Sequence, residues 1–189
     1  EPIEPPRVSR KEVQFLDKAQ TAILLKAAED RALYPILVLA VTTGMRRGEL
    51  LGLRWSDVNL DAKNKKGKPA PYLKVAQSLE QTKDGGLQPK EPKSKSGRRR
   101  IDLLLTAAKV LRHHKAKQNE MYMKLGVRPK NTCDLVFTTI DGKPRSPRCL
   151  TKEFSRFIAG LDIPPISLHG LRHTHITHLL ADGVPINVV

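Results

Sequence analysis

The sequence is poor in cysteine, in aromatic residues and in long apolar runs. Two cysteines, Cys133 and Cys149, occur among the 189 residues, too few for a disulfide framework and without the CxxC spacing of a zinc or redox site. We expect them to be buried thiols in a reducing cytoplasm. No apolar run is long enough to cross a bilayer, which argues against a membrane-spanning protein. These absences exclude a disulfide-stapled secreted domain and favour a globular cytoplasmic protein.

Acidic residues are also few relative to basic ones. The chain has 34 lysines and arginines against 19 aspartates and glutamates, which gives a formal net charge of +15. A balance so far from zero predicts a polyanionic partner. Binding to an anionic membrane surface would need a lysine-rich amphipathic helix with bulky aromatics, and aromatic residues make up only 4% of the chain. Nucleic acid is therefore the favoured partner over membrane.

The N-terminal third of the chain predicts two helices. A capping-box pattern that begins at Asp17 predicts a helix over 18–28. Asp30 is expected to cap a second helix, in which Pro35 is tolerated because it lies in the first turn. Because residues 36–41 are apolar all round, we expect this second helix at the centre of the core.

The middle of the chain predicts a small antiparallel sheet, and the rest predicts further helices. Short alternating runs separated by turns predict strands over 58–60, 72–75 and 100–103. Thr106 is expected to cap a long helix that ends near Leu125, and capping signals predict another over 147–158, with a short strand over 134–139 between them. His113 and His114 are expected to be exposed and inert. The expected fold class is α+β and predominantly α-helical.

Residues 83–100, KDGGLQPKEPKSKSGRRR, contain seven basic and two acidic residues. Most such charge runs are solvated loops. The alternative is a hairpin tip that lies along a phosphate backbone, where each cation releases a counterion. In that case the DNA contacts would come from Lys90, Lys93, Arg98, Arg99 and Arg100.

An arginine follows the predicted central helix directly. In TTGMRRGELLGLRW, Arg46 comes two residues after the glycine that ends the apolar run. We therefore expect the buried helix to fix the backbone that carries this side chain. Glu49 is three residues further on and can hold the Arg46 guanidinium on a short helix. The alternative interpretation is an ordinary surface ion pair, which contributes little to stability.

A second segment, SLHGLRHTHITHLLADG, predicts a helix over 169–182 that ends at Gly183 and Pro185. It contains His169, Arg172, His173, His175 and His178, whereas Leu171, Ile176, Leu179 and Leu180 are expected to face the core. His169 and His173 are four apart and could bind a metal, but no Asp, Glu or Cys nearby completes a zinc shell. Anion-binding side chains without paired carboxylates favour phosphodiester chemistry without a metal.

The segments TTGMRRGELLGLRWSDVNLD and SLHGLRHTHITHLLADGVPINVV resemble the two conserved boxes of the tyrosine recombinases, in particular the phage-type and mobile-element integrases. The resemblance implies that residues 17–189 form the DNA breaking-rejoining catalytic domain of that family. PKSKSGRRRIDL resembles the hairpin that carries the catalytic lysine, which implies Lys95, with Lys93 as the alternative. The implied catalytic residues are Arg46, Lys95, His169 and Arg172, supported by Glu49 and His173.

The same resemblance implies an activity. In this family a tyrosine cleaves a DNA strand through a 3'-phosphotyrosyl intermediate, which allows site-specific recombination or integration of a mobile element without a metal or other cofactor. The implied partners are double-stranded DNA and further copies of the protein in a synaptic tetramer. The implied location is the cytoplasm of a bacterial host, at the nucleoid.

The sequence departs from the family pattern in its tyrosines. Tyr34, Tyr72 and Tyr122 all lack the family's tyrosine context, so none is assigned as the nucleophile. We therefore expect a catalytic domain that is incomplete at its C-terminus and inactive by itself. Residues 1–16, which have three prolines in the first six positions, predict a linker from an absent N-terminal DNA-binding domain. A non-catalytic DNA-binding relative is the alternative, and a histidine-based metal phosphodiesterase is the third hypothesis.

Overall fold

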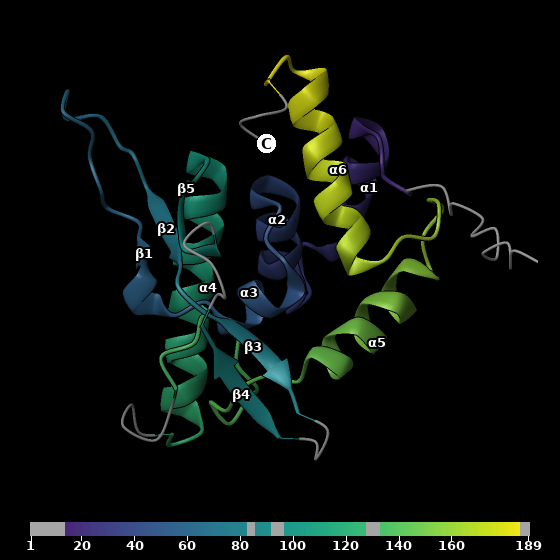
Figure 1. Ribbon diagram of the computed structural model, residues 1–189. Coiled ribbons are helices and arrows are strands. Elements are labelled where there is room, and N and C mark those ends of the chain that lie inside the picture. Colours follow the sequence, from purple (N-terminus) through teal and green to yellow (C-terminus); the bar gives the residue numbers. More distant parts are fainter. Residues whose placement is uncertain (1–13, 83–85, 92–96, 128–132, 186–189) are drawn as a thin grey trace, which may run out of the picture.

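The computed structural model describes residues 14–82, 86–91, 97–127 and 133–185. These residues form an α+β fold in which helices predominate, as predicted (Figure 1). The elements are α1 (Lys18–Ala28), α2 (Tyr34–Thr43), α3 (Arg47–Gly52), the 3-10 helix η1 (Trp55–Asp57), β1 (Val58–Asn59), β2 (Tyr72–Val75), β3 (Ser78–Gln81), β4 (Leu87–Lys90), β5 (Arg99–Asp102), α4 (Leu105–Lys124), α5 (Pro147–Ile158) and α6 (Leu168–Ala181).

Helix α2 is the centre of the fold. It contacts α1, α3, α4 and α6, and its residues from Pro35 to Val41 are all buried (Figure 1). A helix surrounded by other elements has no face for polar side chains, which explains the apolar run at 36–41. The predicted position of this helix is therefore confirmed.

The predicted antiparallel sheet is confirmed, with strand order β1-β2-β5. Leu73 of β2, which pairs with Ile101 of β5, is fully buried. A second pair of strands, β3 and β4, was not predicted from the sequence. Within this hairpin Leu79 is the buried residue, so the alternation of apolar and polar residues that predicts a strand is almost absent. The hairpin packs on α3 through β3.

Only some of the predicted N-cap residues cap a helix in the structure. Asp17 caps α1 through the predicted capping box, since its carboxylate accepts from the backbone N–H of Gln20 at 2.7 Å. Asp30 does not cap α2, because a turn intervenes and the helix begins at Tyr34, with Pro35 in its first turn as predicted. Thr106 lies inside α4 rather than at its cap.

Residues 134–139 do not form the predicted strand. They make isolated bridges, between Leu135 and Arg54 and between Thr138 and Pro144. The Val136 N–H donates to the Leu53 carbonyl at 2.8 Å, but the Val136 carbonyl is bonded by side chains of α4. Gln118 Nε2 donates to it at 3.1 Å, and His114 Nε2 contacts it at 2.8 Å. The prediction that His114 is exposed is therefore wrong, whereas that for His113 is confirmed.

Other predictions of burial were wrong at single positions. Cys133 is half-buried. Cys149 is exposed on α5, because that helix buries a different face, formed by Leu150, Phe154 and Phe157. In α6, Leu171 is buried, but Leu180 is 40% exposed near the end of the helix.

The N-terminal boundary of the packed region can be placed by Leu16. This residue, the last of the predicted linker, is fully buried, and its N–H donates to Thr174 Oγ1 at 3.0 Å. The packed domain therefore begins at or before Leu16, while residues 1–13 lie outside the described residues. No helix in the described ranges is long and apolar enough to span a bilayer.

Candidate active site

Arg46 is positioned by the end of the central helix. Gly44 ends α2 with a φ of 60°, a left-handed conformation that glycine adopts without strain, and Met45 is buried beside it. Arg46 follows in extended conformation as the N-cap residue of α3. Its side chain is 60% exposed, so the turn directs the guanidinium out of the core.

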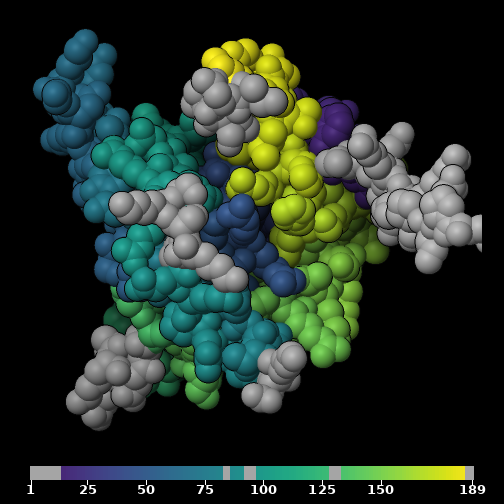
Figure 2. Space-filling model, in the orientation of Figure 1, coloured from purple at the N-terminus to yellow at the C-terminus, as the bar shows by residue number. Residues whose placement is uncertain are grey.

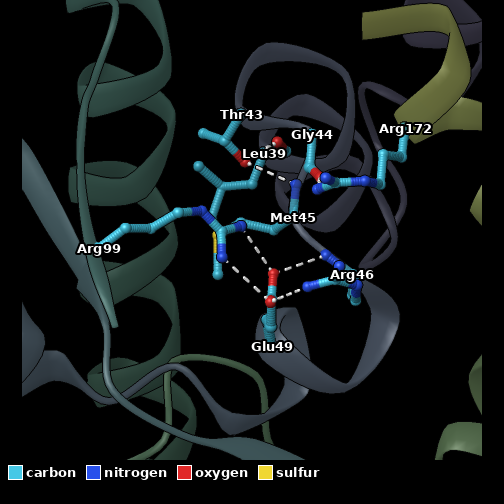
Figure 3. A network of polar contacts seen from close by, with 8 residues as sticks. All are labelled: Leu39, Thr43, Gly44, Met45, Arg46, Glu49, Arg99 and Arg172. Atoms are coloured by element: carbon cyan, nitrogen blue, oxygen red, sulfur yellow. Dashed lines mark hydrogen bonds and ion pairs between the residues drawn. The ribbon is translucent and has the colours of Figure 1, made fainter. Parts of the chain in front are cut away.

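Glu49 is a buried carboxylate that joins two arginines. It accepts from the backbone N–H of Arg46 at 2.9 Å and from Arg46 Nη1 at 3.0 Å, which confirms the predicted pair. It also accepts from Arg99 Nη1 and Nη2, at 3.1 and 2.8 Å (Figure 3). Burial by itself raises the pKa of Glu49, but the hydrogen bonds from Arg99 and Arg46 outweigh burial and hold that pKa below its ordinary value. The carboxylate is therefore charged.

Arg172 reaches the same place from α6. Its Nη1 donates to the Gly44 carbonyl at 2.5 Å, which ties α6 to the end of α2 (Figure 3). Burial, together with the charges of Arg46 and Arg99, lowers the pKa of Arg172 below its ordinary value, although an arginine in a protein stays protonated. Two guanidinium groups thus bind one carboxylate and a third lies near them, so the cluster carries a net positive charge.

His169 lies at the start of α6 and is exposed. Burial of part of the ring and the proximity of His173, Arg172 and Arg46 all lower its pKa, so the imidazole is mostly neutral at pH 7. His173 contacts it edge-to-face, with ring centroids 4.8 Å apart. A neutral imidazole beside two arginines can accept a proton or donate a hydrogen bond.

An open groove of about 790 Å³ lies beside Arg46 and His169. Its walls come from α3, from β3 and from α5 and the start of α6, and Figure 2 shows the surface of α3 between the teal hairpin and the green α5. Three basic residues that the sequence did not single out, Arg47, Arg148 and Lys152, also line it. Arg148 and Lys152 are four residues apart on α5, the spacing of one helix face, and that spacing could have revealed them.

The basic residues predicted to bind DNA are paired with carboxylates wherever the structure describes them. Lys90 pairs with Glu80 at 2.9 Å, Arg98 with Glu91 at 2.5 Å and Arg100 with Asp102 at 2.9 Å. These pairs are exposed, and such pairs are weak enough for a phosphate to replace the carboxylate. Arg99 differs because its partner is the buried Glu49. Lys93 and Lys95 lie outside the described residues.

The remaining histidines of α6 and the tyrosines have other partners. His175 Nδ1 contacts the Val41 carbonyl at 2.8 Å, and His178 Nε2 contacts the Leu16 carbonyl at 3.0 Å. Tyr122 shares a hydrogen bond with Thr138 at 2.6 Å. Within the described ranges, no three His, Cys, Asp or Glu side chains are grouped so that they could hold a metal ion.

Comparisons with known proteins identify the family of the chain. The sequence pattern of the phage integrase family matches residues 13–189. The chain is similar to a tyrosine recombinase XerC-like protein of Caldanaerobacter subterraneus subsp. tengcongensis, with 27% identity over 188 residues that cover 94% of this chain and 46% of that protein.

The fold is also similar to those of solved integrases. The Tn1549 transposon integrase, in complex with transposon right end DNA, superposes with a TM-score of 0.71 and 20% identity, over 94% of this chain and 56% of that one. The lambda integrase of a tetramer bound to a Holliday junction gives a TM-score of 0.51 and 19% identity, over 97% and 47% of the two chains. The chain thus spans about half the length of the relatives it matches. Since the family match covers nearly all of its residues, the chain belongs to the phage integrase family.

Proposed function

We propose that this chain is the phosphate-binding part of a tyrosine-type site-specific recombinase that integrates or otherwise recombines a mobile element in double-stranded DNA. One observation carries the proposal. Arg46 and Arg172, distant in the sequence, reach the same end of α2 beside His169, and the cluster they form has more positive charge than the single carboxylate of Glu49 can neutralise.

The two arginines suit a scissile phosphate. A guanidinium presents a planar fork of N–H donors that matches two phosphate oxygens, whereas an ammonium group matches one. Arg46 and Arg172 would bind the non-bridging oxygens and stabilise the charge that develops on them in the transition state. Glu49 holds the Arg46 side chain, and the Gly44 carbonyl holds that of Arg172, so little reorganisation of either is needed when DNA binds.

In the proposed reaction the energy of the broken phosphodiester bond is kept in a covalent bond between the protein and DNA. A tyrosine hydroxyl attacks phosphorus, the bond from phosphorus to the 5'-oxygen breaks, and the 3'-phosphate becomes linked to the tyrosine. His169 would accept or steer the tyrosine proton, and Lys95, or alternatively Lys93, would donate a proton to the 5'-oxygen. A 5'-hydroxyl of another strand reverses these steps and releases the tyrosine.

The tyrosines of this chain do not suit the role of nucleophile. None of Tyr34, Tyr72 and Tyr122 lines the groove beside Arg46, and the Tyr122 hydroxyl is already bonded to Thr138. We therefore propose that residues 1–189 by themselves do not cleave DNA, and that another part of the protein supplies the tyrosine. The match to about half of each relative's length is compatible with such a part.

The proposed partners are duplex DNA and further copies of the protein in a synaptic tetramer. The net charge of +15 supports the first, and the similarity to a lambda integrase solved as a tetramer on a Holliday junction supports the second. With chromosomal DNA as its substrate, the protein would act in the cytoplasm of a bacterial host, at the nucleoid.

The test uses the complete protein and a nicked suicide duplex that traps the covalent intermediate. We expect a protein–DNA adduct that survives denaturing electrophoresis and that forms equally with and without a chelator. DNA binding without an adduct would instead indicate the non-catalytic relative. Loss of cleavage upon chelation would indicate the metal-dependent phosphodiesterase.

A further inference from the structure

Arg99, the first residue of β5, behaves differently from its two neighbours in the sequence. The side chains of Arg98 and Arg100 are 59% and 54% exposed and pair with exposed carboxylates, whereas that of Arg99 is 29% exposed. Both Nη atoms of Arg99 donate to Glu49, each to a different carboxylate oxygen, at 3.1 and 2.8 Å. Arg99 therefore points toward Glu49, and it does not line the groove beside Arg46.

Glu49 receives Arg99 and Arg46 symmetrically. Oε1 accepts from Arg46 Nη1 and from Arg99 Nη1, and Oε2 accepts from the Arg46 backbone N–H and from Arg99 Nη2. The two arginines approach the carboxylate from opposite sides (Figure 3). With four donors on two oxygens, the Glu49 carboxylate is held in the orientation in which it also bonds Arg46.

The charges of the three groups decide what Arg46 can do. Glu49 and Arg46 alone would form a neutral pair, and a neutral pair attracts a phosphate weakly. With Arg99 the three groups carry a net charge of +1. Since Arg99 is half-buried and does not line the groove, whereas the Arg46 side chain is 60% exposed there, that charge is available on Arg46.

We propose that Arg99 is a positioning residue: it neutralises the buried Glu49 and fixes its carboxylate, so that Arg46 faces the groove with its charge free for a phosphate. Arg99 thus acts through Glu49 rather than by touching DNA. The inference rests on the proposed function, because the anion is the scissile phosphate.

The first test compares Arg99→Gln with the wild type in the complete protein, using the nicked suicide duplex. Adduct formation is expected to slow by about tenfold or more, as for loss of a transition-state donor, while the Kd for DNA changes by less than about threefold. The double variant Arg99→Gln/Glu49→Gln restores the net charge of +1 and is expected to recover a large part of the lost rate.

Arg145→Gln is the matched control. Arg145 is also a partly covered arginine, 16% exposed, and is paired with a carboxylate, Glu153, that does not line the groove. Its substitution should leave the rate of adduct formation unchanged. An equal slowing in Arg145→Gln would mean that losing any covered ion pair slows cleavage. Equal losses of binding and cleavage in Arg99→Gln, or no recovery in the double variant, would also overturn the proposal.

A second readout separates this inference from the proposed function. If the wild type forms no adduct, the recombinase proposal fails. The positioning role of Arg99 is then tested by the NMR signal of the Arg46 Nε–H group, which is identified by its absence in Arg46→Lys. A guanidinium held in one position gives a separate signal, and this signal should be kept in Arg145→Gln. In Arg99→Gln it should shift into the overlapped signals of solvent-exposed arginines. An unchanged Arg46 signal in Arg99→Gln would overturn the positioning role.

Discussion

Glu49 and His114 are titratable side chains that the fold largely covers, with opposite consequences for their charge. Four hydrogen bonds from two arginines keep Glu49 ionised despite its burial. The His114 ring is close to those of Trp55 and Phe137, with centroids 6.1 and 5.3 Å away, and its partner is a neutral carbonyl, that of Val136. Burial lowers the pKa of His114, so this imidazole stays neutral at pH 7.

Replacing Arg172 tests the geometry of its guanidinium. In Arg172→Lys the charge is kept, but the three N–H donors of an ammonium group diverge from a single nitrogen. They cannot replace a planar guanidinium that donates to the Gly44 carbonyl and also presents a parallel pair of N–H groups to two phosphate oxygens. Adduct formation on the suicide duplex should fall by about 100-fold or more, while DNA binding changes little because one phosphate contact among many is affected. Arg112→Lys is the control, since Arg112 likewise donates to a backbone carbonyl, that of Leu60, but its charged partner is the exposed Asp61. Arg172, by contrast, lies near the charges of Arg46 and Arg99. A comparable loss in Arg112→Lys would contradict the specific role.

The covered His114 makes stability depend on pH. Because its folded-state pKa is lowered, the unfolded chain binds more protons once the pH falls below the ordinary histidine pKa of about 6.5. Its contribution to stability is therefore complete above that pH and is lost as the pH falls toward the folded-state value. Urea unfolding at pH 7 and pH 5 should show a loss of unfolding free energy at the lower pH.

His114→Phe isolates this contribution. The phenyl ring keeps the contact with Trp55 and Phe137, and the Val136 carbonyl retains its hydrogen bond from Gln118. His169 and His175, whose pKa values are also lowered by burial, titrate in both proteins and cancel in the comparison. The variant should lose less stability than the wild type between pH 7 and pH 5, and equal losses would refute the assignment to His114.

At the scale of elements, the end of α2 is the point where the candidate site is assembled. Arg172 and His175 of α6 contact the carbonyls of Gly44 and Val41, which the helix itself leaves without partners. The backbone of α2 then turns at Gly44 into α3 and Arg46. One helix terminus therefore sets the positions of both arginines.

Gly44→Ala tests this junction. A Cβ at Gly44 would lie 2.5 Å from His175 Cδ2, and that ring is held by its contact with Val41. The φ of +60° adds strain of its own, so the variant should lose more than about 1 kcal/mol of unfolding free energy, measured with urea, and should cleave DNA more slowly. Gly67→Ala provides the control, because Gly67 also has a positive φ, of 72°, but no atom within 4 Å of the added Cβ. If both variants lose the same stability, the contact with His175 is unimportant.

For the molecule as a whole, we expect charge to be the main determinant of the proposed affinity for DNA. The net charge is +15, and basic residues line the groove beside Arg46. The complete protein should bind duplex DNA with an affinity that falls steeply as salt rises, because phosphate contacts release counterions. If Lys90 and Arg98 exchange their carboxylate partners for phosphates, Lys90→Gln/Arg98→Gln should reduce the slope of log K against log salt by about 2. An unchanged slope would mean that their pairs with Glu80 and Glu91 persist on DNA.

Several features were predictable because they depend on residues close together in the chain. The apolar run at 36–41 predicted the central helix α2, and the capping box of Asp17 and Gln20 predicted the N-terminus of α1. The three-residue spacing predicted the pair of Arg46 and Glu49. Local signals failed where a distant side chain satisfied the backbone, as Gln118 does for residues near 136. They failed also for the β3–β4 hairpin, which buries little of its own surface.

By itself, the sequence determined the two arginine-bearing segments, the positive charge and the resemblance that led to the family, because each is a property of local composition and spacing. Only the tertiary structure decided that Arg172 meets the end of α2, that Arg99 turns inward to Glu49 while Arg98 and Arg100 do not, and that α5 adds basic residues to the groove. The physical reason is that a hydrogen bond to a buried group depends on which elements pack together. Three consecutive arginines are equivalent by sequence pattern alone, and packing distinguishes them by giving one of them a buried carboxylate as its partner.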